Sequence, residues 1–157
     1  MIFKDLMSLV STNVSVLSCI KDQLIYGCTV SSLVSVNISN ESPEILFVLK
    51  KESMIGKEIE RQGLFAVNLL NFAQKQLAEK YANQREPDNF TNNNWNISEQ
   101  KFAQLVNARA VMNCSFNRKY TDHAADIFIG TVGSFIGNSE VSGLVYDSRK
   151  YGRFLFD

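Results

Sequence analysis

The sequence predicts a mainly β fold, a closed or nearly closed β-barrel with flanking helices. About six segments have the pattern of strands, whereas only three short segments have the spacing of amphipathic helices. Two of the strands, residues 44–49 and 64–70, are apolar on both faces, as strands covered on both sides are. The chain has 157 residues without a linker or an internal repeat, which is the size of one globular domain. We therefore predict a single domain over residues 1–157.

The first third of the chain predicts one helix and three strands. Residues 1–10 place apolar side chains at helical spacing, which predicts a short amphipathic helix. Residues 13–20 and 26–36 alternate with a period of two, and the sequence KDQL between them is typical of a hairpin turn. Residues 44–49, EILFVL, follow Pro43 as a near-continuous apolar run, which predicts a buried strand.

Strand and helix then alternate. The segment SMIGKEIERQG predicts a short helix with Ser53 as its N-cap and Gly63 as its end. Residues 64–70, LFAVNLL, predict a second buried strand. Residues 73–84 predict a helix with Leu77, Ala78 and Tyr81 on one face.

The last part of the chain predicts a loop followed by strands. Residues 85–99 contain Pro87 and a cluster of asparagines, which predicts a loop. Residues 108–116 and 126–136 predict strands joined by a polar turn, and the glycines of the second strand indicate a bend or a close backbone approach. The tail predicts one more short strand and a Tyr-Gly turn.

The charge and hydropathy of the chain exclude several classes of partner. Lysine and arginine number 16, aspartate and glutamate also number 16, and the formal net charge is zero. This balance gives no global attraction to nucleic acid or to an anionic membrane, so we expect neither as a partner. No apolar run approaches the roughly 20 residues of a membrane span, and the N-terminus does not have the layout of a signal peptide. We expect a cytoplasmic protein.

Few catalytic chemistries are open to the side chains of this protein. Cys19, Cys28 and Cys114 are widely spaced, which predicts buried free thiols in place of a disulfide or a thiolate metal site. The single histidine, His123, excludes a multi-histidine metal site, and no GxSxG motif supports a hydrolase. Neither GxGxxG nor GxxxxGKS occurs. We expect no metal and interpret His123 as an exposed loop residue in preference to a catalytic one.

Hydroxyl side chains line one face of the strand predicted over residues 26–36, YGCTVSSLVSV. Thr29, Ser31 and Ser35 occupy odd positions, and the alternation slips at Ser32. An antiparallel sheet commonly keeps one face in water, so this row is either a solvated surface or a set of hydrogen-bond partners for a ligand. A bulge at the slip would turn side chains towards such a ligand.

Two further polar residues have both a structural and a functional interpretation. Asn68 interrupts an apolar strand, and a buried amide without partners costs about 1–3 kcal/mol. It therefore needs either backbone partners or a ligand. Ser53 is a helix N-cap, and a helix N-terminus also receives phosphate.

In combination these features resemble the flavin reductase-like family of FMN-binding split barrels. The resemblance is carried by YGCTVSSLVSVNISNESPEILFVLKKESM, residues 26–54, and by GLFAVNLLNFAQKQLAEKYA, residues 63–82. Trp95, the strand IFIGTV and the closing LVYDSRKYGRF agree with it, so that it spans roughly residues 8–154. Members of this family use NADH or NADPH to reduce FMN or FAD, and they often supply reduced flavin to a separate monooxygenase.

The resemblance implies a wall for the flavin along the hydroxyl strand. The matching Thr29, Val30, Ser31 and Ser32 would lie along the flavin ring and its ribityl chain, and Ser35 would continue that wall.

Two other segments complete the flavin site that the resemblance implies. Lys51, Ser53 and Met54 match the segment that meets the flavin phosphate, where a helix start and an ammonium group favour an anion. Phe65 and Asn68 match the strand beside the cofactor.

The C-terminal motif agrees with the family, whereas the expected histidine is displaced. Tyr151, Gly152 and Arg153 match the closing motif near the flavin or the nicotinamide. Many members carry Gly-Asp-His before the Ile-Phe strand, and that histidine is implicated in nicotinamide binding. Here it aligns with Ala125, and His123 lies two residues earlier.

The leading hypothesis is a homodimeric flavin reductase that transfers a hydride from NADH or NADPH to FMN or FAD. One alternative is an FMN-binding electron-transfer or flavin-storage protein without NAD(P)H oxidation, which the displaced histidine favours. The other alternative is a barrel that binds no flavin and keeps the hydroxyl row in water.

Overall fold

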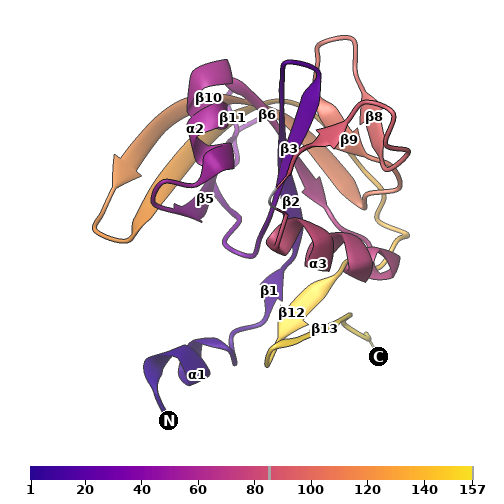
Figure 1. Ribbon diagram of the computed structural model, residues 1–157. Coiled ribbons are helices and arrows are strands. Elements are labelled where there is room, and N and C mark those ends of the chain that lie inside the picture. Colours follow the sequence, from indigo (N-terminus) through magenta and orange to yellow (C-terminus); the bar gives the residue numbers. More distant parts are fainter. Residues whose placement is uncertain (85, 157) are drawn as a thin grey trace.

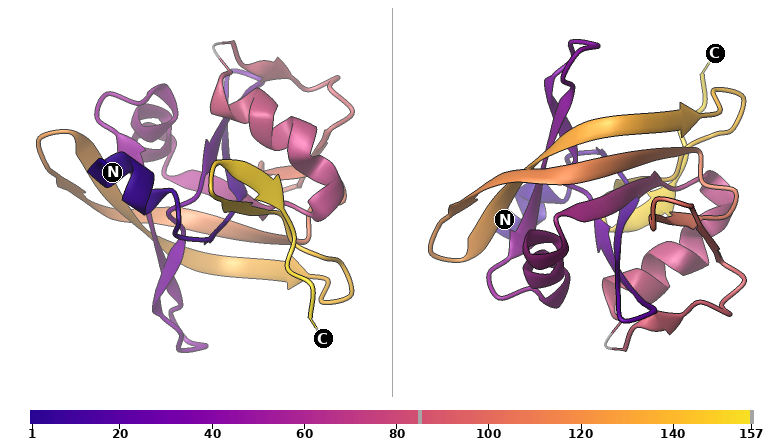
Figure 2. Two further views of the ribbon diagram at one scale, coloured as in Figure 1. Left: turned by 90° about the horizontal axis from the view of Figure 1, so that it is seen from below. Right: turned by 90° about the horizontal axis from the view of Figure 1, so that it is seen from above.

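The body of the protein is a coiled antiparallel sheet of eight strands, in the order β4-β5-β11-β10-β6-β2-β3-β7 (Figure 1). The computed structural model describes residues 1–84 and 86–156. The strands of this sheet are β2 Ser15–Lys21, β3 Leu24–Val30, β4 Val34–Asn37, β5 Glu44–Lys50, β6 Leu64–Leu69, β7 Asp88–Asn89, β10 Ala110–Thr121 and β11 Ala125–Gly137. The predicted mainly β fold is confirmed. The hairpin of β4 and β5 projects from the body in both views of Figure 2.

The sheet coils until β3 approaches β5, and a side chain joins them there. The hydroxyl of Ser32, just beyond β3, accepts a hydrogen bond from the Val48 N–H at 2.9 Å and donates one to the Val48 carbonyl at 3.3 Å. Both partner groups belong to β5. We call this junction, between residues 28–32 and 48–50, the seam.

The barrel interior is packed with aromatic and aliphatic side chains. Phe47 stacks on Phe128 with ring centroids 5.3 Å apart and meets Phe65 edge-on at 5.4 Å. Gly130 makes this arrangement possible, because a Cβ atom there would lie 2.5 Å from Cζ of Phe65. The close approach predicted for the β11 glycines is thus confirmed at Gly130.

Helix α2, Met54–Gln62, covers one end of the barrel. Its Ile55 and Ile59 are buried in the interior cluster. Ser53 caps the helix by accepting a hydrogen bond from the Gly56 N–H at 3.5 Å, and Gly63 ends it at φ 74°. Both predicted helix boundaries are confirmed.

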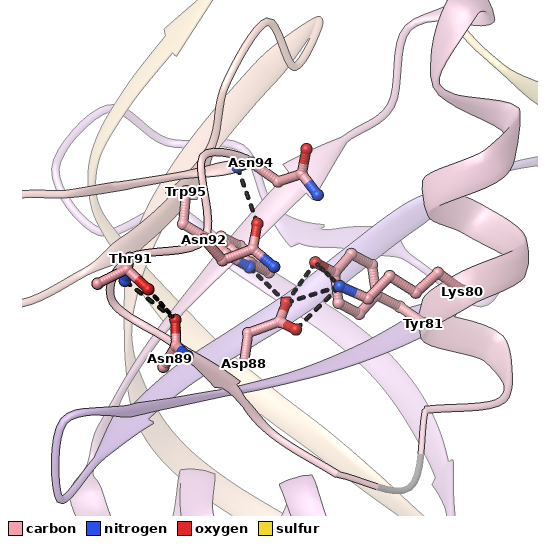
Figure 3. A network of polar contacts seen from close by, with 8 residues as sticks. All are labelled: Lys80, Tyr81, Asp88, Asn89, Thr91, Asn92, Asn94 and Trp95. Atoms are coloured by element: carbon pink, nitrogen blue, oxygen red, sulfur yellow. Dashed lines mark hydrogen bonds and ion pairs between the residues drawn. The ribbon is translucent and has the colours of Figure 1, made fainter.

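A second core lies on the outer face of β2, β3 and β6. It is covered by the 3-10 turn η1, Phe72–Gln74, by helix α3, Lys75–Ala82, and by the hairpin of β8, Trp95–Ile97, and β9, Ala103–Leu105. Asp88 joins these pieces, because Lys80, Tyr81 and Trp95 all donate hydrogen bonds to its carboxylate (Figure 3). One carboxylate thus fixes α3 to the segment that follows it.

The two ends of the chain form a small separate sheet. Strand β1, Thr12–Asn13, pairs with β12, Val145–Asp147, which pairs with β13, Lys150–Gly152. Helix α1, Phe3–Met7, lies beside this sheet and has no buried residue (Figure 1). Its contacts include the bond from the Ser148 N–H to the Ser8 carbonyl at 2.7 Å.

The structure corrects the predicted strand over residues 26–36. It is two strands with a break at residues 31–33, because Ser32 bonds to β5 in place of continuing the β3 ladder. Val34 and Val36 continue the predicted alternation but are exposed, because β4 is an edge strand that projects from the body (Figure 2).

Two further expectations differ in detail. Residues 85–99, predicted as a loop, include the short strands β7 and β8 among their described part. In the tail the turn falls at Ser148 and Arg149, which have positive φ, so that Tyr151 and Gly152 lie in a strand. Among residues 1–84 and 86–156, no helix is long and apolar enough to cross a membrane.

Candidate functional site

A groove of about 540 Å³ lies along the seam of the barrel. We call it the seam groove. Its lining comes from the end of β3, the break that follows, the end of β5, the start of β11, Ser53 and the end of α3. The lining residues are Cys28, Thr29, Val30, Ser31, Ser32, Val48, Leu49, Lys50, Ser53, Ala82, Ala124 and Ala125.

The seam groove lies where the chain leaves β3 and turns onto β5. Ser32 bonds to Val48 there, and the chain then continues as β4, which pairs with β5 from Val34 opposite Leu46, whereas β3 itself has no ladder with β5. Thr29 is held in the wall by the hydrogen bond that its hydroxyl donates to the Ala78 carbonyl at 2.8 Å. Ser31 is exposed at the rim. The groove therefore presents hydroxyl oxygens with free lone pairs beside the apolar Val30 and Leu49.

One end of the seam groove is suited to an anion. Ser53 lies there as the N-cap of α2, a helix of nine residues whose N-terminus carries partial positive charge. Lys50 adds an ammonium group to the lining. Lys51 is exposed next to it, outside the lining, and its backbone N–H donates to the Ala124 carbonyl.

A second cavity of about 330 Å³ adjoins the seam groove. We call it the α3 pocket. It shares Cys28, Ser53 and Ala82 with the seam groove. The remaining lining residues are Tyr26, Gly27, Met54, Ile55, Tyr81, Gln84, Glu86 and Pro87.

Cys28 stands between the two cavities as a neutral thiol. Burial raises the pKa of Cys28 above its ordinary value, and Lys50 lowers it by a smaller amount. The thiolate is the nucleophilic form of cysteine, so Cys28 acts as a polarizable wall residue at neutral pH.

The structure brings part of the predicted flavin set together. Thr29, Val30, Ser31, Ser32 and Ser53 line the seam groove. Met54 lines the α3 pocket next to it. Ser35, by contrast, is exposed on β4 and belongs to neither cavity.

Asn68 is enclosed in the second core. Its side chain is fully buried, its Nδ2 donates to the Val16 carbonyl and to the Ser18 hydroxyl, and its Oδ1 accepts from the Leu105 N–H at 2.8 Å. These bonds hold β9 on the outer face of the sheet. Within this chain Asn68 therefore has a structural role and lines neither cavity, and its position beside the cofactor stays a prediction.

Phe65 also lies away from both cavities, because it belongs to the core inside the barrel. Its ring is buried in the barrel interior, in edge-on contact with Phe47 and close to Gly130. A strand apolar on both faces has one face for each core, and Phe65 belongs to the inner one. Phe65 is thus a core residue that lines neither cavity, and its position beside the cofactor stays a prediction.

The closing motif lies at another cavity. Tyr151, Gly152 and Arg153 line a space of about 350 Å³ beside β12 and β13, together with residues such as Ser11 and Asp147. The Arg153 guanidinium lies over the Phe72 ring at 4.9 Å. Within this chain, these residues are not part of the seam groove.

Ala125 and His123 lie two residues apart, and only Ala125 reaches the seam groove. Ala125 lines the seam groove at the start of β11. His123 is exposed on the turn between β10 and β11 and does not line the groove. No histidine of the described residues therefore reaches it, since His123 is the single histidine of the chain.

Sequence reasoning missed several lining residues of the seam groove. Cys28, Val48, Lys50 and Ala82 are ordinary members of their strands or helix, and only the approach of β3, β5 and α3 brings them together. Lys50 is the one with a local signal, because it precedes the helix N-cap by three residues.

A family model connects the chain with known proteins. The model described as "Flavin reductase like domain" matches residues 7–154.

Two curated relatives have similar sequences. The NADH-dependent FAD reductase of Streptomyces globisporus is 27% identical over 135 residues, which cover 83% of this chain and 73% of the relative. The reductase subunit HsaB of a flavin-dependent monooxygenase from Mycobacterium tuberculosis H37Rv is 26% identical over 113 residues. That match covers 72% of this chain and 59% of the relative.

Solved structures share the fold. The Streptomyces globisporus NADH:FAD oxidoreductase SgcE6, in complex with NAD and FAD fragments, has a TM-score of 0.87 at 23% identity and covers 98% of this chain and 92% of its own. BorF, the flavin reductase component of a bacterial two-component tryptophan halogenase, has a TM-score of 0.87 at 24% identity. That match covers 98% of this chain and 97% of BorF.

Proposed function

Because the chain belongs to the flavin reductase-like family, we propose that it is an NAD(P)H-dependent flavin reductase, which reduces FMN or FAD and supplies the reduced flavin to a monooxygenase. The observation that carries this proposal is the seam groove, in which an apolar wall, a row of hydroxyl oxygens and a helix N-terminus follow one another. A flavin has the same sequence of parts, namely a ring, a ribityl chain and a phosphate.

The groove residues would bind and orient the two nucleotides. Bound flavin supplies the redox chemistry, because its ring accepts a hydride from the nicotinamide. Val30 and Leu49 offer apolar contact to a ring. The Thr29 hydroxyl offers an acceptor to its polar groups, and the Ser31 hydroxyl offers both an acceptor and a donor. Ser53 offers the N-terminus of α2 to the phosphate.

The groove needs no acid or base to perform this reaction. Among its lining residues the titratable side chains are Cys28 and Lys50. The pKa of Cys28 is raised by burial, so the thiol stays protonated. Orientation of the two rings is thus the main task of the protein.

A reduction assay crossed over FMN, FAD, NADH and NADPH tests the proposal. We expect loss of nucleotide absorbance near the 340-nm region with at least one pair, and saturation with both substrates. Failure of all four pairs under anaerobic conditions would overturn the proposed activity.

Ser53 provides a test of the phosphate position. Ser53→Asp keeps an N-cap residue but sets a carboxylate against the phosphate, so we expect flavin affinity to fall by about tenfold or more. Ser53→Asn is the matched control, because asparagine caps a helix equally well without the charge. Equal affinities of the two variants would place the phosphate elsewhere.

A flavin carrier without NAD(P)H oxidation is the second candidate. Ala125 favours it, because the groove has a methyl group where many family members have a histidine. Stopped-flow mixing of flavin-loaded protein with NADH or NADPH distinguishes the two functions. A reductase loses its flavin absorbance within the experiment, whereas a carrier keeps it with both nucleotides.

We also propose that the protein is a homodimer. Apolar side chains are exposed on α1, on β4 and its following turn, and on the C-terminal tail, with Phe3 75%, Ile38 84% and Leu155 81% exposed. Exposed apolar surface of this extent is typical of an association site. Light scattering after size exclusion should give twice the chain mass of 17.7 kDa. A mass of one chain at micromolar concentration would contradict the dimer. The location of the protein in the cytoplasm stays a prediction.

A further inference from the structure

We propose that the α3 pocket binds the adenosine half of FAD, so that this chain takes FAD in preference to FMN. The inference rests on the proposed function, because it extends the flavin site of the seam groove. It concerns residues that the sequence did not identify as cofactor contacts, Gln84 above all.

The first support is the adjacency of the two cavities. Cys28, Ser53 and Ala82 line both, so that the seam groove and the α3 pocket adjoin at these three residues. Their volumes of about 540 and 330 Å³ each fall within the range of small-molecule sites. A ligand that fills both is elongated and has two bulky ends.

The second support is the position of the helix N-terminus. Ser53 lies at the boundary between the cavities, where the N-terminal amides of α2 favour negative charge. FMN ends at its phosphate and would leave the α3 pocket empty. FAD continues through a second phosphate to adenosine, so its negative charges lie in the middle of the molecule, as the anion site lies between the two cavities.

The third support is the chemistry of the pocket lining. Tyr26, Met54 and Pro87 offer apolar and aromatic surface to a flat base. The Oε1 atom of Gln84 is buried without a hydrogen-bond partner among the described residues. A buried amide oxygen in this state costs stability unless a ligand donates to it.

A glutamine amide matches the edge of adenine. It presents one acceptor and one donor side by side, and adenine presents its 6-amino group beside a ring nitrogen. Glu86 at the rim of the pocket adds a carboxylate, which accepts hydrogen bonds from ribose hydroxyls in other nucleotide sites. The lining thus recognises a purine nucleoside.

NADH also contains adenosine, so either FAD or NADH could supply the ligand of the α3 pocket. The position of Ser53, which lines both cavities, favours FAD. The phosphates of FAD reach Ser53 directly from a flavin in the seam groove. The adenosine of NADH would require the same anion site that the flavin phosphate already occupies. We therefore assign the α3 pocket to FAD.

Calorimetric titration of the full chain with FAD and with FMN tests the inference. We expect FAD to bind about tenfold more tightly, as one or two hydrogen bonds and a stacked base provide. Gln84→Ala should lower the affinity for FAD by about threefold or more and change that for FMN by less than twofold. Gln76→Ala, on the exposed face of α3, is the matched control and should preserve the tenfold preference.

The possible results separate the inference from the proposed function. Equal binding of FAD and FMN by the wild-type chain would overturn the inference and leave the flavin reductase intact. A Gln84→Ala variant with a raised KM for NADH and an unchanged FAD preference would assign the pocket to the other dinucleotide and also overturn it. Binding of neither flavin would overturn the proposed function itself.

Discussion

Asn68 illustrates how a single buried side chain can replace part of a backbone ladder. Its amide bonds to Val16, to Ser18 and to the Leu105 N–H, and thereby holds β9 on β2 and β6. Ser18 adds its own bond to the Ala103 carbonyl at 2.6 Å. Two polar residues in an apolar layer thus fix the outer hairpin in register.

Replacing Asn68 should reduce stability without affecting flavin binding. Asn68→Ala leaves the buried Leu105 N–H without a partner and creates a small cavity, so we expect a loss of about 2–4 kcal/mol. Urea denaturation followed by circular dichroism measures the loss. Ser35→Ala, on exposed β4, is the control and should lie within about 0.5 kcal/mol of wild type. A large fall in flavin affinity of folded Asn68→Ala would support the cofactor role.

The rate at which the Cys28 thiol is alkylated measures whether the seam groove is occupied. Cys19 and Cys114 are buried, whereas Cys28 is half-buried between the two cavities. We expect slow alkylation of one thiol in the native protein, because burial also raises the pKa of Cys28. Saturating flavin should slow the reaction further.

Cys28→Ser identifies the labelled thiol. The variant should lose the slow reaction in mass spectrometry while the other two cysteines stay unmodified until the protein unfolds. Undiminished labelling of Cys28 in the presence of bound flavin would separate the flavin site from this wall.

At the scale of elements, strand β11 contains one glycine without space for a Cβ atom, Gly130, and one with space for it, Gly133. A Cβ atom at Gly130 would lie 2.5 Å from the Phe65 ring, whereas at Gly133 the nearest atom is the Asn113 carbonyl oxygen at 3.7 Å. Gly130 is buried and paired on both sides, with Phe116 and with Ile45, whereas Gly133 is exposed at the register shift between β10 and β11.

Matched alanine substitutions should therefore have unequal costs. Gly130→Ala forces Phe65 from its place in the core, and we expect a loss of about 1–3 kcal/mol. Gly133→Ala should cost less than about 1 kcal/mol, because its Cβ makes ordinary contact. Equal midpoints of thermal unfolding for the two variants would contradict the packing around Phe65.

Local patterns predicted most elements, and the errors fall where a distant partner decides. Ser53 and Gly63 bound α2 as expected, because capping depends on neighbours in the chain. The break after Val30 depends on the bond between Ser32 and Val48, sixteen residues away, so alternation alone predicted one strand. The need of Asn68 for partners was evident, but the choice between β9 and a ligand is made by tertiary contacts.

For the whole molecule, buried carboxylates connect stability with acid pH. Burial raises the pKa of Asp88, but hydrogen bonds from Lys80, Trp95 and Tyr81 outweigh it and hold the pKa below its ordinary value. Burial likewise raises the pKa of Glu58, and the bonds from Lys21 and Gln62 again bring it below the ordinary value. A lowered pKa in the folded state contributes stability above the unfolded value near about 4, which is lost as the pH falls through the folded value.

The buried thiols make the stability depend on alkaline pH in the opposite direction, because their pKa values are raised. Burial raises the pKa of Cys19 and of Cys114 from 9.0 to about 12. A raised pKa contributes stability that is complete below 9.0 and decreases as the pH rises towards 12.

The unfolding free energy should therefore be level between about pH 6 and 8 and fall on both sides. Urea titrations across pH measure it, and Cys114→Ala should flatten the alkaline decline relative to wild type. An alkaline decline that Cys114→Ala leaves unchanged would assign it to other groups.

The junction between β3 and β5 leaves the width of the groove free to change during evolution. Because one serine hydroxyl makes the connection, substitutions at Ser31 or Ala125 alter the walls without breaking a row of main-chain bonds. The walls of the seam groove can thus change while the ladders of the barrel stay intact.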